Sequence, residues 1–281
     1  MTVAIVQTLD KTCPDVKSRR DRPLGSAVGD RLARMADPIG IDFGGSGIKA
    51  APVDLKTGEF SAERERIDTP EKSTPKNVAE VMAELLEKFE DQKSPVGVTV
   101  PGVVRKRGVI GSAANIDKSW IGTDADDLLS EALKREVHVI NDADAAGLAE
   151  VRYGVARGRD GLTIVTTLGT GIGSALLHDG VLVPNSELGH LEIDGHDAES
   201  KAANSARKSE DLSWEEWAER LTAYYRTLEK LFSPDLIVIG GGVSKHAQEF
   251  VPLIDVHTEI VSATLRNTAG IVGAAVLASE S

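Results

Sequence analysis

Two glycine-rich turns separate apolar strand patterns at the same place in each half of the chain. The first turn contains Gly44, Gly45, Ser46 and Gly47, and it lies between the apolar segments 38–43 and 48–53. The second contains Gly169, Thr170, Gly171 and Gly173, between segments 162–168 and 173–178. One glycine hairpin is common in proteins. Two at equivalent places predict a duplicated fold whose turns bind one polyanion from both sides.

Strand and helix patterns alternate from residue 38 onward, which is typical of an α/β domain. In the first half, the sequence predicts strands at 38–43, 48–53, 60–67 and 96–100, and helices at 76–91 and 123–135. In the second half, it predicts strands at 137–140, 162–168, 173–178, 181–183 and 235–239, and helices at 143–153, from 213 onward and at 267–278. Ser213 and Glu216 have the spacing of a capping box, which marks the start of the longest helix.

These patterns predict two lobes with a central cleft. We expect a small lobe of residues 38–140 plus 269–281 and a large lobe of residues 141–268. The segment 1–36 carries seven basic and four acidic residues and shows no sustained apolar periodicity. Its apolar run at 3–6 is shorter than the 7–15 residues of a secretory signal. We therefore expect residues 1–37 to be a disordered extension.

Charge and cysteine content exclude several classes of protein. The chain has 32 basic and 44 acidic residues, a net charge of −12. Nucleic acids and anionic membranes attract broad basic surfaces, so we expect neither as a partner. No apolar stretch approaches the roughly 20 residues of a membrane span. The single cysteine, Cys13, excludes a disulfide framework and a cysteine-built zinc site, and it fits a cytoplasmic location.

Two aspartates follow predicted strands and are candidates for chemistry. Asp142 comes directly after the apolar strand 137–140, and the carboxyl ends of parallel strands are where α/β folds place reactive groups. A carboxylate there can accept a proton from a hydroxyl. Asn141 and Asp142 are also good helix N-caps, which is the alternative interpretation. Asp42 is a candidate to hold Mg²⁺ through water, with Lys49 adding positive charge.

Two further segments suit a sugar and a phosphate chain. Glu187, His190 and Glu192 combine carboxylates with an imidazole, which matches neighbouring sugar hydroxyls. A metal site and a plain surface histidine are the alternatives there. The predicted strand 235–239 is followed by Gly240, Gly241 and Gly242. These glycines leave room for an adenine ring or a phosphate chain. The alternative is an ordinary strand-to-helix turn. Neither glycine turn has the Gly-Lys-Ser/Thr ending of a Walker loop.

Five segments carry a resemblance to a known family. They are Gly-Ile-Asp-Phe-Gly-Gly-Ser-Gly-Ile-Lys (40–49), Ala-Ala-Asn-Ile-Asp-Lys-Ser-Trp (113–120), Asn-Asp-Ala-Asp-Ala-Ala (141–146), Glu-Leu-Gly-His-Leu-Glu-Ile (187–193) and Leu-Arg-Asn-Thr-Ala-Gly-Ile-Val-Gly-Ala-Ala (265–275). Together they resemble the ROK family (repressors, open reading frames and kinases) over residues 38–281. The resemblance implies an actin-like, ribonuclease-H-like α/β fold. It also implies phosphorylation of glucose at the 6-hydroxyl, with Mg²⁺ and with inorganic polyphosphate, ATP or both as phosphoryl donor.

The resemblance also assigns residue roles. It implies Asp142 as the catalytic base, and as sugar ligands Asn115, Asn141, Glu187 and His190. The first phosphate motif would be residues 42–49, the second 168–173, and the nucleotide-side motif 240–244. Most family members follow the Gly-His pair with a cysteine-rich zinc motif, but residues 195–211 contain no cysteine, so no zinc is expected. Glu192 or Glu199 is expected to replace the sugar contact of that motif, and the sequence leaves both open.

Partners and alternatives follow from the same resemblance. It suggests a homodimer. A long polyphosphate needs a track of basic side chains on the protein. The candidates for this track are Arg105, Lys106, Arg107, Lys118, Lys245, His246 and Arg266. The alternative for each candidate is an ordinary solvated charge. The alternatives are an ATP-only hexokinase of other sugar preference and a sugar-responsive repressor. An actin-like filament or chaperone ATPase is disfavoured by the chain length and by the Glu187/His190 pair.

Overall fold

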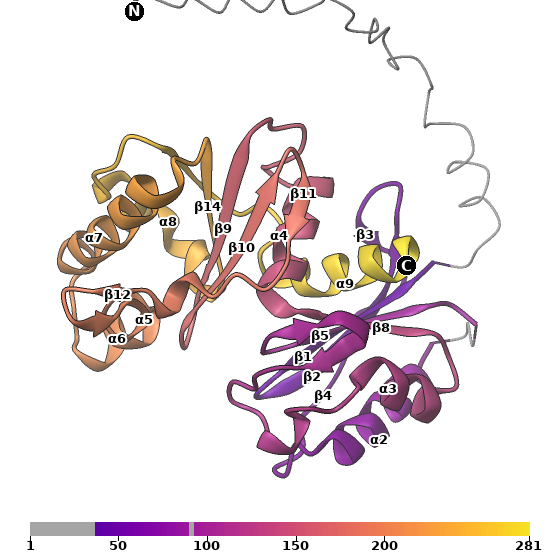
Figure 1. Cartoon of the computed structure of the whole chain (residues 1–281). Coiled ribbons are helices and arrows are strands. Elements are labelled where there is room, and N and C mark those ends of the chain that lie inside the picture. Colours follow the sequence, from indigo (N-terminus) through magenta and orange to yellow (C-terminus); the bar gives the residue numbers. More distant parts are fainter. Residues whose placement is uncertain (1–36, 90–92) are drawn as a thin grey trace, which may run out of the picture. The chain divides into compact units, whose positions relative to one another are not determined.

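The computed structural model describes residues 37–89 and 93–281, and of Arg107 it describes only the backbone. The prediction for residues 1–37 therefore lies outside the described residues except at Asp37. Within the described part, helices flank two large β-sheets (Figure 1). None of the helices described is long and apolar enough to cross a membrane.

The first sheet begins with an antiparallel meander of β1 (Ile39–Gly44), β2 (Gly47–Asp54) and β3 (Glu59–Phe60). Two parallel strands, β5 (Val96–Val100) and β8 (Val137–Asn141), extend it beyond β1. β4 (Glu65–Ile67) pairs separately with β2. The prediction of one strand over 60–67 is wrong, because residues 61–64 are exposed and leave the sheet between β3 and β4.

The second sheet repeats the order of the first. β9 (Leu162–Leu168), β10 (Ile172–His178) and β11 (Val181–Val183) form the antiparallel meander. β14 (Leu236–Gly240) and β15 (Glu259–Ser262) are the parallel strands. The orders β3-β2-β1-β5-β8 and β11-β10-β9-β14-β15 correspond strand by strand. This correspondence confirms the predicted duplicated fold, although β15 was not among the predicted strands.

Helices cover both faces of each sheet. α2 (Pro75–Leu86) and α3 (Ala125–Leu133) pack on one face of the first sheet, and α9 (Ala269–Glu280) packs on its other face (Figure 1). α7 (Trp214–Phe232) covers the second sheet through Trp217, Leu221 and Tyr225, and it starts at the predicted capping box. α4 (Asp142–Tyr153) packs on β9 and β10 and also on α9. The predicted helix 76–91 ends earlier, at Leu86.

Short elements complete the described part. The strands are β6 (Val104–Arg105), β7 (Val109–Ile110), β12 (Glu192–Ile193) and β13 (His196–Asp197). The helices are α5 (Ala198–Ala202), α6 (Asn204–Ser209) and α8 (Ala247–Phe250). The 3₁₀ helices are η1 (Lys106–Gly108), η2 (Lys118–Trp120), η3 (Leu188–His190), η4 (Gly242–His246), η5 (Val251–Leu253) and η6 (Arg266–Thr268).

α9 lies directly on the backbone of its neighbours. A Cβ added to Gly97 in β5 would lie 1.8 Å from the carbonyl oxygen of Ala274 in α9. A Cβ added to Gly273 in α9 would lie 1.8 Å from the carbonyl oxygen of Ala145 in α4. Glycine at these positions therefore sets how closely α9 approaches both the first sheet and α4.

Candidate active site

Asp142 is the first residue of α4, at the carboxyl end of β8. One of its carboxylate oxygens, Oδ1, accepts a hydrogen bond of 2.9 Å from the backbone N–H of Ala143. The side chain remains accessible to water, but protein surrounds it closely and lowers its solvation. This desolvation, opposed by the Ala143 bond and reinforced by the charges of Asp42 and Glu187, raises the pKa of Asp142 to about 6.

Asn141 precedes Asp142 and caps the same helix. Its side-chain oxygen accepts hydrogen bonds from the N–H groups of Ala143 and Asp144 at 2.8 and 3.0 Å. Its amide nitrogen donates to the carbonyl oxygen of Gly102 at 3.1 Å. The capping interpretation of Asn141 is thus confirmed. Its contact with a sugar stays a prediction. One hydrogen of the amide group remains to donate to a sugar oxygen, because the other is donated to Gly102.

Asp42 lies on β1 beside the ends of the parallel strands. The backbone register places Asp42 opposite Thr99 of β5, whose neighbouring residue Val100 is opposite Asn141 of β8. The Asp42 carboxylate forms an ion pair of 2.9 Å with Lys49 and accepts a 3.3 Å hydrogen bond from the Thr99 hydroxyl. The positive charge predicted to come from Lys49 is therefore already paired with Asp42.

A cavity of about 200 Å³ brings several predicted residues together. Asp42, Lys49 and Asp142 line it, as do the three glycines 240–242 after β14. Gly241 adopts a positive φ of 82°, and a Cβ on it would lie 2.6 Å from the carbonyl oxygen of Leu168. The third glycine motif therefore packs against the end of β9, where the second glycine turn begins.

The first glycine turn is a two-residue connection with Gly45 and Ser46 exposed at its tip. The carbonyl oxygen of Ser46 accepts a 3.0 Å hydrogen bond from Arg66. A Cβ on Gly45 would lie 3.4 Å from the carbonyl oxygen of Asn115, so the predicted sugar ligand Asn115 lies beside this turn. Asn115 is exposed and has a φ of 60°, a conformation that asparagine tolerates better than most residues.

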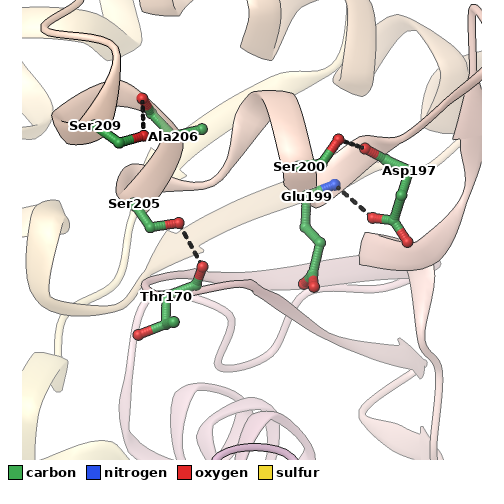
Figure 2. Close-up of a pocket in the computed structure, with 7 residues that line it drawn as sticks. All are labelled: Thr170, Asp197, Glu199, Ser200, Ser205, Ala206 and Ser209. Carbon is green, nitrogen blue, oxygen red and sulfur yellow. Dashed lines mark hydrogen bonds between the residues drawn. The ribbon is translucent and has the colours of Figure 1, made fainter.

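The second glycine turn is held by α6. The N–H group of Ser205 donates to the carbonyl oxygen of Gly169 at 3.1 Å, and the Ser205 hydroxyl donates to the carbonyl oxygen of Thr170 at 2.5 Å. Figure 2 shows Ser205 and Thr170 on one side of a pocket that Asp197 and Glu199 also line. At the other end of the turn, a Cβ on Gly173 would lie 3.0 Å from the Cβ of Ala143, next to Asp142.

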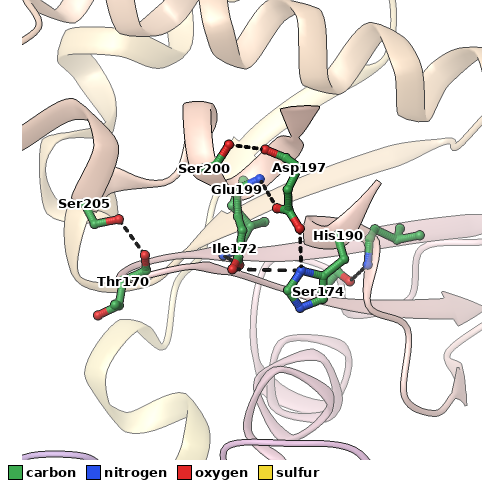
Figure 3. Close-up of polar contacts among 9 residues, drawn as sticks. Thr170, Ile172, Ser174, His190, Asp197, Glu199, Ser200 and Ser205 are labelled. Carbon is green, nitrogen blue, oxygen red and sulfur yellow. Dashed lines mark hydrogen bonds and ion pairs between the residues drawn. The ribbon is translucent and has the colours of Figure 1, made fainter. Parts of the chain in front are cut away.

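Glu199 connects this turn with His190. One oxygen, Oε2, accepts a 2.9 Å hydrogen bond from the N–H of Ile172, and the other, Oε1, lies 3.9 Å from Nδ1 of His190 (Figure 3). Asp197 lies closer, with Oδ2 at 2.9 Å from the same nitrogen. The hydrogen bond to Asp197, with smaller contributions from nearby carboxylates, raises the pKa of His190.

Glu187 immediately precedes η3, which contains His190. Desolvation raises the pKa of Glu187; the Glu199 charge adds to this rise and His190 opposes it. The Glu187 charge in turn contributes to the raised pKa of Asp142, so these carboxylates act on one another electrostatically. Glu192 is exposed on β12, and its carboxylate takes part in none of these hydrogen bonds.

Known proteins match both the sequence and the fold. The ROK family model matches residues 38–201. Polyphosphate glucokinase of Mycobacterium tuberculosis (strain CDC 1551 / Oshkosh) is 49% identical over 238 residues, which are 84% of this chain and 89% of that protein. Polyphosphate glucokinase of Mycobacterium leprae (strain TN) is 48% identical, over 84% of this chain and 73% of that protein. The chain belongs to the ROK family.

A solved structure agrees with this membership. The crystal structure of inorganic polyphosphate/ATP-glucomannokinase from Arthrobacter sp. strain KM has 54% sequence identity and a TM-score of 0.83. The match covers 87% of this chain and 99% of that one. The fold of this ROK protein is therefore the actin-like fold that the sequence predicts.

The region of the family's zinc motif has a different composition in this ROK protein. Residues 195–211 contain no cysteine. Among the described residues, His190, Asp197 and Glu199 place one ligand atom each within 4.8 Å of one another, a spacing that a metal ion can bridge. Sequence reasoning did not group Asp197 and Glu199 with His190, because only the fold of β13 and α5 returns them to the histidine. The absence of zinc stays a prediction.

Sequence reasoning missed Asp144, which is 1% exposed in α4. Its Oδ2 accepts a 2.8 Å hydrogen bond from the N–H of Asn185, and its Oδ1 has no hydrogen-bond partner in the described part of the chain. The Asn185 side chain pairs with both backbone polar groups of Val104 in β6. Asp144 thereby fixes the segment that leads to Glu187. Its burial, together with the charges of Glu187 and Asp142, raises its pKa to about 7.

The raised pKa of Asp144 predicts how stability depends on pH. Native Asp144 binds its proton more tightly than unfolded aspartate, whose pKa is near 3.8, so the free energy of unfolding falls as pH rises toward 7. Between pH 5.5 and 8 this loss amounts to about 2 kcal/mol. We expect Asp144→Asn to remove it, because the amide does not ionise. Urea unfolding across this pH range measures the difference. The exposed control Asp160→Asn should keep the wild-type slope, and an unchanged slope in Asp144→Asn would contradict the assignment.

Proposed function

We propose that this protein transfers the terminal phosphoryl group of inorganic polyphosphate or ATP to the 6-hydroxyl of glucose. The observation that carries the proposal is Asp142, a carboxylate with a pKa near 6 in a cavity lined by Asp42, Lys49 and three consecutive glycines. The names of relatives at 48–49% identity support the same reaction. A structural neighbour named for both donors supports the use of ATP beside polyphosphate.

In the proposed reaction, the sugar O6 attacks the terminal phosphorus as the bond to the bridging oxygen breaks. The leaving group is ADP or a polyphosphate one unit shorter. Asp142 takes the hydroxyl proton as the new O–P bond forms, because a free alcohol is a very weak acid. A pKa of about 6 makes Asp142 a stronger base than an ordinary aspartate while it remains ionised at neutral pH. Backbone N–H groups of the glycine turns and alignment of the reactants supply most of the remaining acceleration.

Mg²⁺ fits the oxygen groups at this site. Asp42 and Asp142 line the same cavity, and carboxylates are the ligands that Mg²⁺ prefers. Lys49 and Thr99 engage part of the Asp42 carboxylate, which leaves lone pairs for a water-mediated contact. A bound Mg²⁺ would neutralise donor charge, and we assign Asp42 to hold it through water.

For the sugar, we propose Asn115, Asn141, Glu187 and His190 as ligands, with Glu199 rather than Glu192 completing the set. Glu199 lies against the second glycine turn and His190, whereas the Glu192 carboxylate takes no part in that network. We expect Glu199→Gln to raise the KM for glucose about 10-fold or more, the effect of weakening one charged hydrogen bond. Glu192→Gln should change it less than about twofold. Steady-state kinetics at saturating donor give both values, and a reversed order would reject Glu199.

One coupled assay tests the function itself. Glucose phosphorylation is measured with Mg²⁺ and either ATP or polyphosphate as donor, using glucose, mannose and glucosamine in turn. Activity with ATP only, or with another sugar preferred, would favour the alternative of a different ROK hexokinase. No turnover with any pair, together with specific DNA binding, would favour the repressor alternative.

We also propose a homodimer in the cytoplasm without nucleic-acid partners. Support comes from the family resemblance, the net charge of −12 and the single cysteine. Light scattering of the purified protein gives its mass in solution directly. A mass near 29.8 kDa, that of one chain, would overturn the dimer.

A further inference from the structure

Arg266 lines the same cavity as Asp142 but on the side of the third glycine motif. Asn267 and Gly270 continue this wall into the start of α9, and a Cβ on Gly270 would lie 3.1 Å from Oδ1 of Asp42. Of the residues that the structure describes, two cations line the cavity, Lys49 and Arg266. Lys49 is paired with Asp42 at 2.9 Å, whereas Arg266 is exposed and forms no ion pair with the described residues. Arg266 is therefore the cation available to a bound anion.

The backbone of Arg266 is held in an unusual conformation. Its φ is +47°, in the left-handed region that residues other than glycine, asparagine and aspartate rarely adopt. The turn closes through Thr268, whose N–H and hydroxyl both donate to the carbonyl oxygen of Leu265, at 2.9 and 2.7 Å. Such backbone conformations persist only where surrounding contacts impose them, and they cluster at ligand sites.

Glu150 of α4 holds the residue that precedes Arg266. The side chain is fully buried, and its Oε1 accepts a 2.7 Å hydrogen bond from the N–H of Leu265, the residue before Arg266. The other oxygen, Oε2, accepts a 3.0 Å bond from the N–H of Val155. One buried carboxylate thus fixes the turn of Arg266 to α4, the helix that begins with Asp142.

We propose that Arg266 binds the phosphates of the donor that are not transferred, and that Glu150 positions it. This inference rests on the proposed function and adds a donor-binding residue to it. Phosphates that remain with the leaving group gain negative charge as the bond to the transferred phosphoryl breaks. A guanidinium can contact two phosphate oxygens at once, which a lysine ammonium cannot do with the same geometry. The contact serves ATP and polyphosphate, since both present phosphates there.

The decisive variant is Arg266→Gly, because glycine removes the guanidinium but accepts a positive φ without strain. We expect kcat/KM for each donor to fall about 10- to 100-fold, as for the loss of a charge-assisted contact, with the KM for glucose unchanged. Arg266→Lys should fall between the wild type and Arg266→Gly. The thermal midpoint should not decrease in Arg266→Gly. Arg64→Gly is the matched control, because Arg64 is exposed and does not line the cavity.

Glu150 is tested through Arg266. Glu150→Gln should raise the donor KM in the wild-type background and leave it unchanged in the Arg266→Gly background, because a positioning residue acts only through the group it positions. Equal effects in both backgrounds would mean that Glu150 is merely structural and would overturn its positioning role.

A binding experiment separates this inference from the proposed function. Tripolyphosphate alone is titrated by calorimetry into wild type and Arg266→Gly, without sugar. Weaker binding to the variant supports the inference even if no sugar is phosphorylated, an outcome that would reject only the proposed reaction. Equal binding, with glucose turnover intact in both proteins, would reject the role of Arg266 and leave the proposed function standing.

Discussion

Replacing Asp142 with asparagine should lower kcat by about 10²–10⁴-fold, the range that general-base catalysis contributes. Asparagine keeps the shape of the side chain but accepts no proton at neutral pH. Glucose binding, measured by calorimetry, should remain detectable, because the other proposed sugar ligands stay in place. The thermal midpoint at pH 8 should stay the same or rise, because the variant removes a carboxylate whose ionised form is disfavoured by desolvation. Substantial residual turnover would remove Asp142 from the role of base.

The pH dependence of wild-type kcat provides a second measurement of the same group. Asp142 must be ionised to accept the proton, and its pKa is raised to about 6. Activity should therefore fall as pH decreases through about 6, approaching tenfold per pH unit below it. The exposed control Asp160→Asn should reproduce this profile. If kcat stays constant from pH 7 to pH 5, a group with an ordinary carboxyl pKa is the base.

Gly97→Ala should destabilise the protein by at least about 4 kcal/mol, the range of severe single substitutions. The added methyl group would lie 1.8 Å from a backbone oxygen of α9, so the helix has to move away from the sheet. For a domain of this size, such a loss lowers Tm by about 8–16 °C. Differential scanning calorimetry measures the shift.

Gly169→Ala is the matched control for this effect. Its added Cβ meets no atom of the described residues within 4 Å, and Gly169 does not adopt a positive φ. We expect its stability to stay within about 1 kcal/mol of wild type, as for an ordinary surface substitution. A Gly97→Ala protein as stable as Gly169→Ala would contradict the close packing of α9 on β5.

Periodic apolar patterns made most of the fold predictable. The two meanders, the strand before Asn141 and the capping box at Ser213 follow from local sequence, because each is specified by residues near one another in the chain. β15 has one exposed and three half-buried residues, so its strand pattern is weak and its place depends on pairing with β14. The exposed break at 61–64 was missed because apolar residues on both sides suggest one continuous strand.

The candidate site was predictable where a residue follows a strand and unpredictable where distant segments meet. Asp42 and Asp142 stand at strand ends, and the structure places both on one cavity. Glu150 lies in the middle of a predicted helix, and only its bond to a residue 115 positions away gives it a role. Asp144 was overlooked for the same reason, since its burial depends on the distant segment around Asn185.

The position of α9 also bears on how the chain folds during synthesis. The first sheet begins at Ile39, but the helix that covers one of its faces comprises residues 269–280, far later in the chain. Domains generally fold in the order of synthesis, N-terminal first. Here the first sheet keeps an apolar face uncovered until α9 has been synthesised. Most of the second sheet and α7 precede α9 in the chain, so they can form before the first sheet reaches its native packing.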